Sequence, residues 1–413
     1  MSLIRPFHGL RPAVGRADSV IAPPYDVLNT EEARERVIGR SNSFLHISKP
    51  EIDLPAGADP YAPQVYDKGR DNFMRMIEEG VLVSDESPCY YFYRLIMGEH
   101  VQTGLVAVAS VADYDSNRIR KHEYTRPDKE DDRVHQIDAL NAHTGPVFLT
   151  YRYSALIDEI AATVTAGSPA MDVMADDGVQ HSVWVVNDTE IIDRITEEFD
   201  GMECVYIADG HHRSAAASRV TAQRKAANAD HTGDEDYNYF LTVIFPDSQM
   251  QILGYNRVVT DLNRKTTDKF LEVVKSSFSV SESSEPVQPK TTAEFGMYLQ
   301  GQWYRININS DLICSDDPVA CLDISLLANH LIDPILGISD PRSDKRIDFV
   351  GGIRGLVELE KRVDSGEMAV AFSLYPTSLA QLMDVADAGE VMPPKSTWFE
   401  PKLADGLVSH MLD

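Results

Sequence analysis

A polar motif centred on one glycine, Asp209-Gly210-His211-His212-Arg213, lies between an apolar segment at 204–208 and an alanine-rich segment at 211–227. The apolar segment has the length of a buried strand, and the alanine-rich one has the composition of a helix. The first amides of a helix lack intrahelical partners and carry the positive end of its dipole, so such a junction favours phosphate. Arg213 and one histidine add donors at the same rim. The motif therefore predicts a phosphate-binding turn.

The carboxylate of Asp209 determines whether phosphate binding at this turn needs a metal ion. A carboxylate beside a phosphate repels it unless a divalent cation bridges the two groups, so Asp209 is the candidate metal ligand of a metal-assisted phosphate site. A simpler interpretation stays open, in which Asp209 only caps the helix and the histidines lie on the surface. A zinc site built from His211 and His212 is disfavoured, because adjacent helical side chains diverge by about 100°.

A second segment that could do chemistry spans 119–126 and carries Glu123. Lys121, His122 and Arg126 flank this carboxylate, and their charges would keep it ionised and suited to act as a general base. A solvated, charged turn is the alternative interpretation.

Two segments stiffened by proline are candidates to line a pocket. The first presents Tyr25 and Asp26 directly after Pro23-Pro24, and the second presents Lys395 and Thr397. Proline-rich turns commonly serve as plain connections between elements. Contact with a substrate and simple packing therefore both stay open for these four side chains.

Composition limits the classes of protein that these motifs can serve. The chain has 413 residues, 43% hydrophobic and 25% charged, which predicts a globular protein of two or three domains. Its net charge of −27 argues against a nonspecific nucleic-acid binder and against docking on anionic membranes. No apolar run has the length of a bilayer span. Four cysteines without a C-x-x-C pair, and a first segment without a long apolar region, indicate the reducing cytoplasm.

The elements that must position the motifs follow from hydrophobic periodicity and turn signals. A hairpin is expected from 90–97 and 101–111, and a second hairpin from 239–245 and 251–259. Between them a strand at 181–186, a helix after Asp188, the strand at 204–208 and the helix after Gly210 alternate. This alternation predicts an α/β unit with parallel strands.

Six segments spread over nearly the whole chain resemble the bacterial and archaeal family designated domain of unknown function 1015. They are Arg5-Pro6-Phe7-His8-Gly9-Leu10, 22–27, Lys121-His122-Glu123, 208–213, 344–352 and 392–402. This resemblance implies a family but no particular activity.

The central part also resembles the ParB/sulfiredoxin-like nucleotide-binding superfamily, and within it the free serine kinases. The shared features are a strand followed by His122-Glu123 and a later strand that ends in Asp209-Gly210-His211-His212-Arg213. The resemblance implies that this turn holds nucleotide phosphates with magnesium and that Glu123 activates the acceptor hydroxyl. It marks Glu123 and His212 as catalytic, Asp209 as the metal ligand, and as phosphate-binding residues Gly210, His211, Arg213 and Ser214.

The differences from that superfamily refine the expectation. His211 stands where sulfiredoxin carries its cysteine, so sulfinic-acid repair is not expected. The separation of Glu123 from Asp209 exceeds that in the compact kinases, which predicts a helical insertion near 134–176. The expected fold is mixed α/β (α+β), with a ParB/sulfiredoxin-like domain at 105–260. N-terminal and C-terminal α/β regions, at 1–104 and 261–413, are expected to pack around it.

Three functional hypotheses remain. The first is a phosphotransferase that uses ATP, ADP or CTP with Mg²⁺ to phosphorylate a small hydroxylated metabolite such as serine. The second is a nucleotide-binding sensor or scaffold without catalysis, and the third is a metal-dependent hydrolase that uses Asp209 and one histidine. The expected partners are a nucleotide and a small-molecule substrate, with neither nucleic acid nor membrane. A homodimer formed through the long terminal regions stays open.

Overall fold

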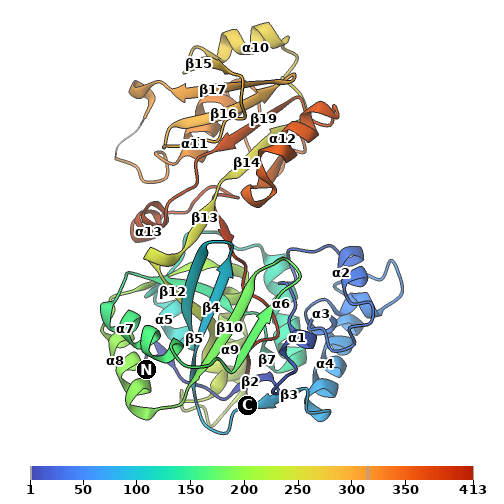
Figure 1. Ribbon diagram of the computed structural model, residues 1–413, viewed down its shortest axis with the longest axis vertical. Coiled ribbons are helices and arrows are strands. Elements are labelled where there is room, and N and C mark those ends of the chain that lie inside the picture. The colour runs from blue at the N-terminus through green and yellow to red at the C-terminus, as the bar shows by residue number, and fades with distance from the viewer. Residues whose placement is uncertain (1, 314–315, 413) are drawn as a thin grey trace. The chain divides into compact units, whose positions relative to one another are not determined.

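The computed structural model describes residues 2–313 and 316–412. The chain divides into two compact units (Figure 1): unit 1 comprises Met1–Met250 and Pro401–Asp413, and unit 2 comprises Gln251–Glu400. Both units combine helices with sheets, so the mixed α/β fold class expected from the sequence is confirmed. No helix in the described residues has both the length and the apolar character that crossing a bilayer requires.

Unit 1 is built on a nine-stranded sheet in which parallel and antiparallel pairs are mixed. Strand β1 (Ile4–Arg5) pairs with β5 (His100–Ser110), and the hairpin of β4 (Tyr90–Met97) and β5 confirms the one expected within 90–111. The main path through the sheet runs β6 (Ile119–Arg120), β11 (Val205–Asp209), β8 (Val147–Tyr151), β12 (Tyr239–Pro246), β5 (His100–Ser110), β4 (Tyr90–Met97), β10 (Gln180–Val186) and β9 (Met171–Met174).

The strand that carries Asp209 has other neighbours than those expected. β11 pairs in parallel with β6 and antiparallel with β8. Strand β10 lies in the same sheet, but β8, β12, β5 and β4 separate it from β11. The expected pairing of 181–186 with 204–208 in a parallel unit is therefore wrong. Hydrophobic periodicity identifies each strand, but it carries no information about which strands pair.

The segment expected to be a helical insertion, 134–176, is helical only in part. It includes the second half of α6 (Pro127–Leu140) and all of α7 (Ala155–Thr165). Between these helices β8 pairs with both β11 and β12, and all its residues are buried. A short run of apolar residues does not by itself distinguish a buried strand from a helix.

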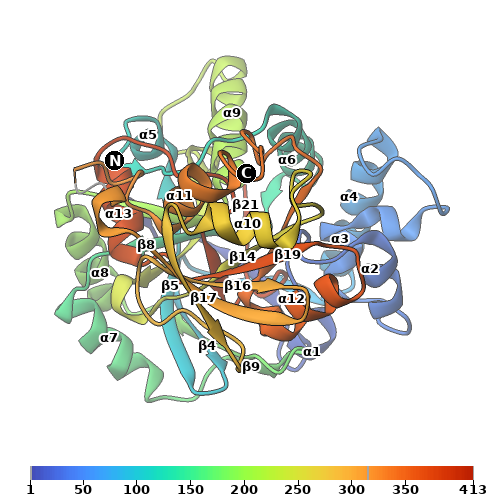
Figure 2. The ribbon, with the colours of Figure 1, turned by 90° about the horizontal axis from the view of Figure 1, so that it is seen from above.

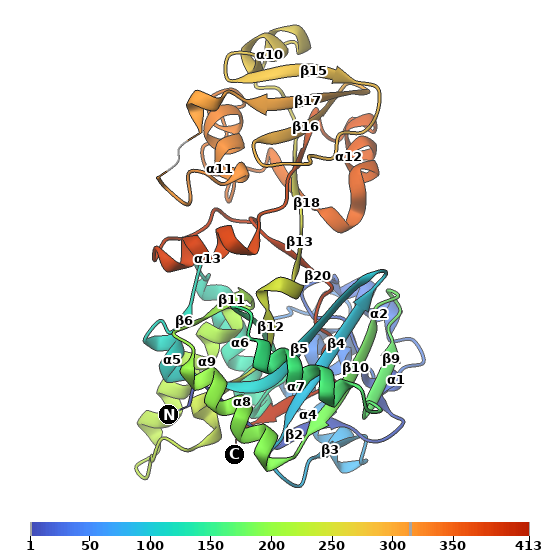
Figure 3. The same cartoon turned by 60° about the vertical axis from the view of Figure 1, so that its left-hand side comes forward.

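Helices cover the sheet and also form a core of their own. α7 and α8 (Thr189–Gly201) cross in front of the strands in Figure 3 and share one hydrophobic core with β5. A second core joins the N-terminal helices, and Figure 2 shows α2 (Thr30–Arg36), α3 (Leu45–Ser48) and α4 (Pro63–Glu78) gathered at one side of unit 1. Unit 1 also contains α1 (Ala17–Val20), α5 (Val111–Asp115) and α9 (His211–Ala227).

The C-terminal tail belongs to unit 1. Strand β21 (Ser409–Met411) lies between β2 (Gly9–Pro12) and β7 (Ala142–His143), and β3 (Leu82–Ser84) completes this four-stranded sheet. Strands from the beginning, the middle and the end of the chain thus form one sheet. The observed division into two units therefore differs from the three regions expected from the sequence, 1–104, 105–260 and 261–413.

Unit 2 contains a six-stranded antiparallel sheet. Its spatial order is β15 (Phe278–Ser283), β17 (Gln302–Ile308), β16 (Glu294–Leu299), β19 (Val370–Leu374), β14 (Tyr255–Val259) and β18 (Ile347–Gly351). A separate pair of strands, β13 (Gln251–Leu253) and β20 (Trp398–Glu400), joins the first and last residues of the unit. The helices are α10 (Thr267–Val274), α11 (Asp323–Leu327), α12 (Gly355–Asp364) and α13 (Leu379–Asp387).

The hairpin expected from 239–245 and 251–259 is wrong. Strand β12 ends in the sheet of unit 1, whereas β13 and β14 belong to two sheets of unit 2. The chain thus leaves unit 1 after Met250, where the sequence predicts a turn within one hairpin.

Candidate functional site

The junction between β11 and α9 has the local structure that the sequence predicts. Asp209 is the last residue of the strand, and Gly210 precedes the helix with φ 100° and ψ 26°. Glycine adopts this left-handed conformation without the steric cost that a β-carbon adds. Within the described residues no side chain caps the helix, so the amides of its first turn stay available to a ligand.

Arg213 folds back over Gly210. A β-carbon at position 210 would lie 3.1 Å from Nε and 3.2 Å from Cζ of Arg213. The guanidinium also donates a hydrogen bond to the carbonyl of Pro146, which fixes it beside the turn. The missing side chain at 210 thus lets a cation lie against the backbone where α9 begins.

Two cations flank the Asp209 carboxylate. Lys402 Nζ donates to Oδ2 at 3.3 Å, and an Arg213 nitrogen lies 4.0 Å from Oδ1. Burial alone would raise the pKa of Asp209, but the charges of Lys402 and Arg213 hold that pKa well below its usual range. The turn therefore presents an ionised carboxylate between two cations.

Arg213 also lines a small cavity of about 30 Å³ within unit 1, together with Tyr25, Arg133 and Asp405. The Arg133 guanidinium carbon lies 4.0 Å from the centroid of the Tyr25 ring. Burial raises the pKa of Asp405 to about 7, although Arg213 acts to lower it. The cavity thus holds two guanidinium groups and a carboxyl group that titrates near neutral pH.

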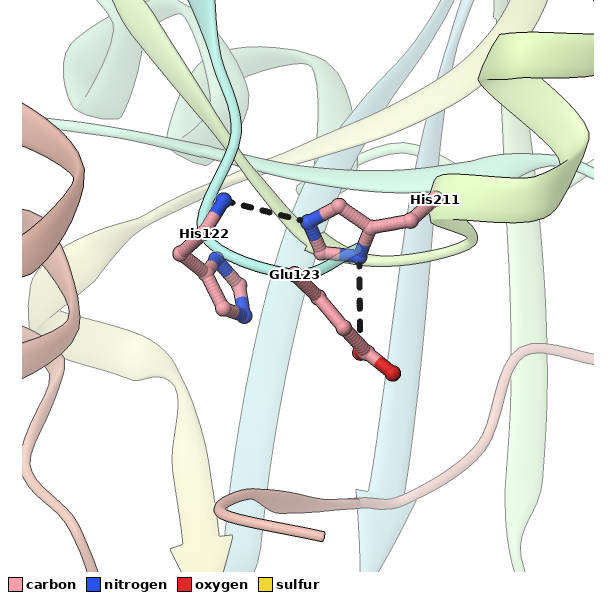
Figure 4. A group of neighbouring side chains, drawn as sticks. All are labelled: His122, Glu123 and His211. Atoms are coloured by element: carbon pink, nitrogen blue, oxygen red, sulfur yellow. Dashed lines mark hydrogen bonds and ion pairs between the residues drawn. The ribbon is translucent and has the colours of Figure 1, made fainter. Parts of the chain in front are cut away.

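Figure 4 shows a second cluster beside the turn, formed by His122, Glu123 and His211. The His122 backbone amide donates to His211 Nε2 over 3.4 Å, and His211 Nδ1 lies 3.8 Å from Glu123 Oε2. Burial holds the pKa of His211 well below its ordinary value, so the ring is neutral. Because Nε2 accepts, the single ring proton lies on Nδ1 and faces the carboxylate.

The His122 ring is only 2% exposed, and burial lowers its pKa to about 4. It contacts the His211 ring edge-on, with the centroids 4.5 Å apart. Its Nδ1 has no hydrogen-bond partner in the part of the chain that the structure describes. One ligand atom each from His122, Glu123 and His211 lie within 4.8 Å of one another, so these residues could hold a metal ion.

The two histidines of the motif contact different partners, as the divergence of adjacent helical side chains requires. His212 Nε2 accepts a hydrogen bond from the Arg126 amide at 3.1 Å, whereas His211 accepts one from the His122 amide. The first turn of α9 therefore holds both ends of segment 122–126, and Glu123 lies between the two contacts.

Ser214, which the sequence marks as phosphate-binding, is fully buried. Its hydroxyl donates to the carbonyl of His211 at 3.0 Å. The Ser214 hydroxyl and both ring nitrogens of His211 thus have partners within the protein. What the turn offers a phosphate is the backbone at Gly210 and the guanidinium of Arg213.

The other expected pocket residues of unit 1 lie in different surroundings. Lys121 Nζ lies 3.9 Å from the centroid of the Tyr114 ring, and Arg126 forms an exposed ion pair with Asp128 at 2.8 Å. Tyr25 lines the small cavity beside Arg213, while the neighbouring Asp26 is exposed.

Lys395 and Thr397 belong to unit 2. Lys395 Nζ lies 5.7 Å from the centroid of the Tyr255 ring, and the Lys395 carbonyl accepts a hydrogen bond from Arg257 at 3.0 Å. Thr397 is half-buried. The contacts described for Lys395 support packing within unit 2, which is the alternative that the sequence left open.

Sequence reasoning missed Lys402, Asp405 and Arg133. Lys402 lies 193 residues after Asp209, so no local pattern could join the two side chains. Asp405 precedes Gly406, which has φ 88°, and an Asp-Gly pair is a recognised turn signal. The pair Asp405-Gly406 therefore indicates a turn near the C-terminus, but it does not indicate what Asp405 contacts.

Comparison with solved structures gives weak likenesses. Free serine kinase in complex with AMP has a TM-score of 0.35 at 13% identity, covering 73% of this chain and 92% of that one. A conserved hypothetical protein from Pyrococcus furiosus has a TM-score of 0.34 at 14% identity, covering 76% and 98%. C-terminally truncated SbnI from Staphylococcus aureus has 0.36 at 10%, covering 73% and 85%. At these TM-scores the likenesses carry no argument about activity.

The family comparison covers the site as well as most of the chain. The chain matches none of the curated proteins. The model of the family described as "protein of unknown function (DUF1015)" matches residues 4–325, which include both the Asp209–Arg213 turn and segment 122–126. The resemblance of the sequence to this family is thereby confirmed, and the chain belongs to the DUF1015 family.

Proposed function

We propose that this chain is a nucleotide-dependent phosphotransferase that acts on a small hydroxylated metabolite such as serine. The observation that carries the proposal is the turn at Gly210, where Arg213 and Lys402 flank the uncapped start of α9. A helix N-terminus with two adjacent cations favours the phosphates of ATP, ADP or CTP. The resemblance of this motif to the phosphate-binding turn of the free serine kinases supports the same assignment.

Glu123 supplies the general base of the proposed reaction. Its side chain is 48% exposed, which leaves room for an acceptor hydroxyl. As the hydroxyl oxygen forms its bond to the terminal phosphorus, the bond to the remaining nucleotide breaks and the proton passes to Glu123. His211 and His212 act as positioning residues, because they hold the two ends of the segment that carries Glu123.

Asp209 would hold a magnesium ion together with the nucleotide phosphates. An ionised carboxylate is a ligand that Mg²⁺ accepts, and Asp209 is one. Since Lys402 already contacts Oδ2, the phosphates have to provide the further ligands. When bound, the ion neutralises charge on the phosphates.

Direct incubation tests the proposal. The full chain is mixed with Mg²⁺, one of ATP, ADP or CTP, and a panel of hydroxylated amino acids that includes serine. We expect a phosphorylated product with at least one pair, detected by mass spectrometry, and nucleotide binding by calorimetry. No product with any pair, together with no nucleotide binding, would remove the proposal.

The Glu123→Gln variant separates catalysis from binding. It removes the proton acceptor but retains the size of a half-exposed side chain, so the fold should persist. We expect turnover to fall by about 10²- to 10⁴-fold, the usual contribution of a general base, with nucleotide affinity nearly unchanged. If turnover and affinity were both unchanged, Glu123 would not be the base, and a nucleotide-binding sensor would be favoured.

A further inference from the structure

We propose that His122, Glu123 and His211 form a binding site for a divalent transition-metal ion of the zinc type. One ligand atom from each residue lies within 4.8 Å of the other two. Two imidazole nitrogens and one carboxylate oxygen form a donor set that suits Zn²⁺ or Co²⁺, whereas Mg²⁺ prefers oxygen ligands alone. This site is therefore distinct from the magnesium site proposed at Asp209.

The local backbone allows these three side chains to converge. His122 and Glu123 are adjacent, and segment 121–126 is neither helix nor strand, so their side chains are not forced apart as they would be on a helix. Tetrahedral ligands about 2.0–2.1 Å from zinc lie about 3.3 Å from one another. His211 Nδ1 and Glu123 Oε2 are already 3.8 Å apart, and Glu123 is exposed enough to move closer.

The buried nitrogen of His122 is the independent observation that points to a ligand. The His122 side chain is almost fully buried, and its Nδ1 has no hydrogen-bond partner in the described chain. An imidazole nitrogen that carries no proton is a usual ligand of zinc-type ions. A bound ion would satisfy a buried acceptor that is otherwise left without a donor.

Ion binding has a defined consequence for His211. The ion has to take the place of the proton on Nδ1, and because a neutral imidazole keeps one N–H, that proton moves to Nε2. A protonated Nε2 cannot accept from the His122 amide, so that contact of 3.4 Å opens. One long hydrogen bond is a small loss against three metal–ligand bonds.

The two proposals are independent in their tests. Both proposals use Glu123: its carboxylate is a ligand in the ion-bound state and a general base in the ion-free state, so the phosphotransferase assay is made on chelator-treated protein with Mg²⁺ added back. Metal binding is measured without nucleotide, Mg²⁺ or acceptor. Failure to bind metal therefore leaves the phosphotransferase proposal untouched, and absence of phosphorylated product leaves the metal proposal untouched.

Metal titration of the full chain tests the site. The purified protein is stripped with a chelator and titrated with Zn²⁺ against a chromophoric competitor, and with Co²⁺ while the visible absorption is recorded. We expect each chain to bind one Zn²⁺ ion tightly. The Co²⁺-loaded protein should show visible absorption bands typical of four- or five-coordinate cobalt. Glu123→Gln and His211→Ala should each weaken Zn²⁺ binding by at least about tenfold.

A matched histidine provides the control. His231 Nδ1 lies 3.1 Å from Glu235, so it forms a His–Glu pair outside the cluster; the His231→Ala variant should keep the tight equivalent. Because His122→Ala removes a buried ring, the half-exposed Glu123→Gln variant decides the test, with its thermal unfolding recorded in parallel. If no tight equivalent binds, or if a folded Glu123→Gln variant binds Zn²⁺ as tightly as the unmodified chain, the proposal is overturned.

Discussion

At the scale of single residues, Gly210 permits two features at once. It adopts a left-handed conformation, and it leaves room for the Arg213 guanidinium against the backbone. Any β-carbon would conflict with both features, since it adds strain to the turn and meets Arg213 at 3.1–3.2 Å. A side chain at position 210 would therefore change both the conformation of the turn and the position of the Arg213 guanidinium.

The Gly210→Ala variant should lose nucleotide affinity by at least about tenfold, because roughly 1–3 kcal/mol of backbone strain and a displaced guanidinium both act on the phosphate site. Calorimetry with the preferred nucleotide measures the loss. Gly57→Ala is the matched control: Gly57 has φ 83° and nothing within 4 Å of its β-carbon position. Equal affinity in the two variants would show that the contact with Arg213 has no role in binding.

Arg213 is expected to depend on its planar fork and not only on its charge. Arg213→Lys keeps the positive charge but removes the bidentate geometry suited to phosphate. We expect nucleotide affinity to fall by about tenfold and the salt dependence of binding to persist. Arg219→Lys, on the same helix in a surface pair with Asp131 at 2.7 Å, should leave the affinity unchanged. An Arg213→Lys variant with full affinity would argue against bidentate recognition.

Local sequence reasoning identified part of the site and could not identify the rest. The turn at 209–213 is a continuous motif whose strand, glycine and helix all lie within a few residues. Lys402 and Asp405 reach the same region from the C-terminal tail, and no periodicity or spacing rule relates residues so far apart. The ring of His211 is buried and accepts from the His122 amide, and its phosphate-binding role stays a prediction.

At the scale of elements, the start of α9 organises the segment that carries Glu123. Both ends of segment 122–126 donate backbone amides to histidines of the first turn of the helix. The sequence predicts strand β11, helix α9 and the hairpin of β4 and β5 correctly, since each has a clear local pattern. It does not predict that β8 lies between β11 and β12, because strand pairing depends on contacts between distant segments.

A buried carboxylate at the start of α11 predicts a pH effect on unit 2. Burial raises the pKa of Asp323 to about 6, although the Ala293 amide donates to the carboxylate at 2.8 Å. The folded state therefore holds this proton more tightly than the unfolded chain does. The contribution of this proton to the free energy of unfolding is therefore fully present below about pH 4, which is the ordinary pKa of aspartate. It is lost as the pH rises through about 6.

The Asp323→Asn variant should remove this dependence, because an amide oxygen still accepts from Ala293 and carries no charge. We expect the free energy of unfolding of unit 2 to rise by about 1–2 kcal/mol at pH 8 and the gain to vanish near pH 4. Urea unfolding at several pH values measures it, with the exposed Asp268→Asn as the control for charge removal. Destabilisation at pH 8 would contradict the expected cost of the buried charge.

At the scale of the whole molecule, unit 2 is an insertion in the chain of unit 1. The chain leaves unit 1 after Met250 and returns at Pro401, and the returning tail supplies both β21 and Lys402. The sequence places a boundary at 260/261 and assigns the tail to a C-terminal region. The sequence alone could not predict that the tail belongs to unit 1, because the only local signal of the tail is that of an ordinary short strand.

This architecture predicts that unit 1 folds without unit 2. Gln251 and Glu400 are register partners in an antiparallel pair, so their Cα atoms lie about 4.5–5.5 Å apart. A linker of about four glycine and serine residues, each spanning up to about 3.5 Å, can therefore join Met250 to Pro401 without strain. We expect the joined chain to unfold in one cooperative transition, as measured by circular dichroism, and to protect the amides of β21 from hydrogen exchange.

A chain cut after Met250 serves as the control. It lacks β21, which pairs with both β2 and β7, so it should be less stable than the joined chain. If the two chains were equally stable, the tail would contribute nothing to unit 1, and if neither folded, unit 1 would require the inserted unit.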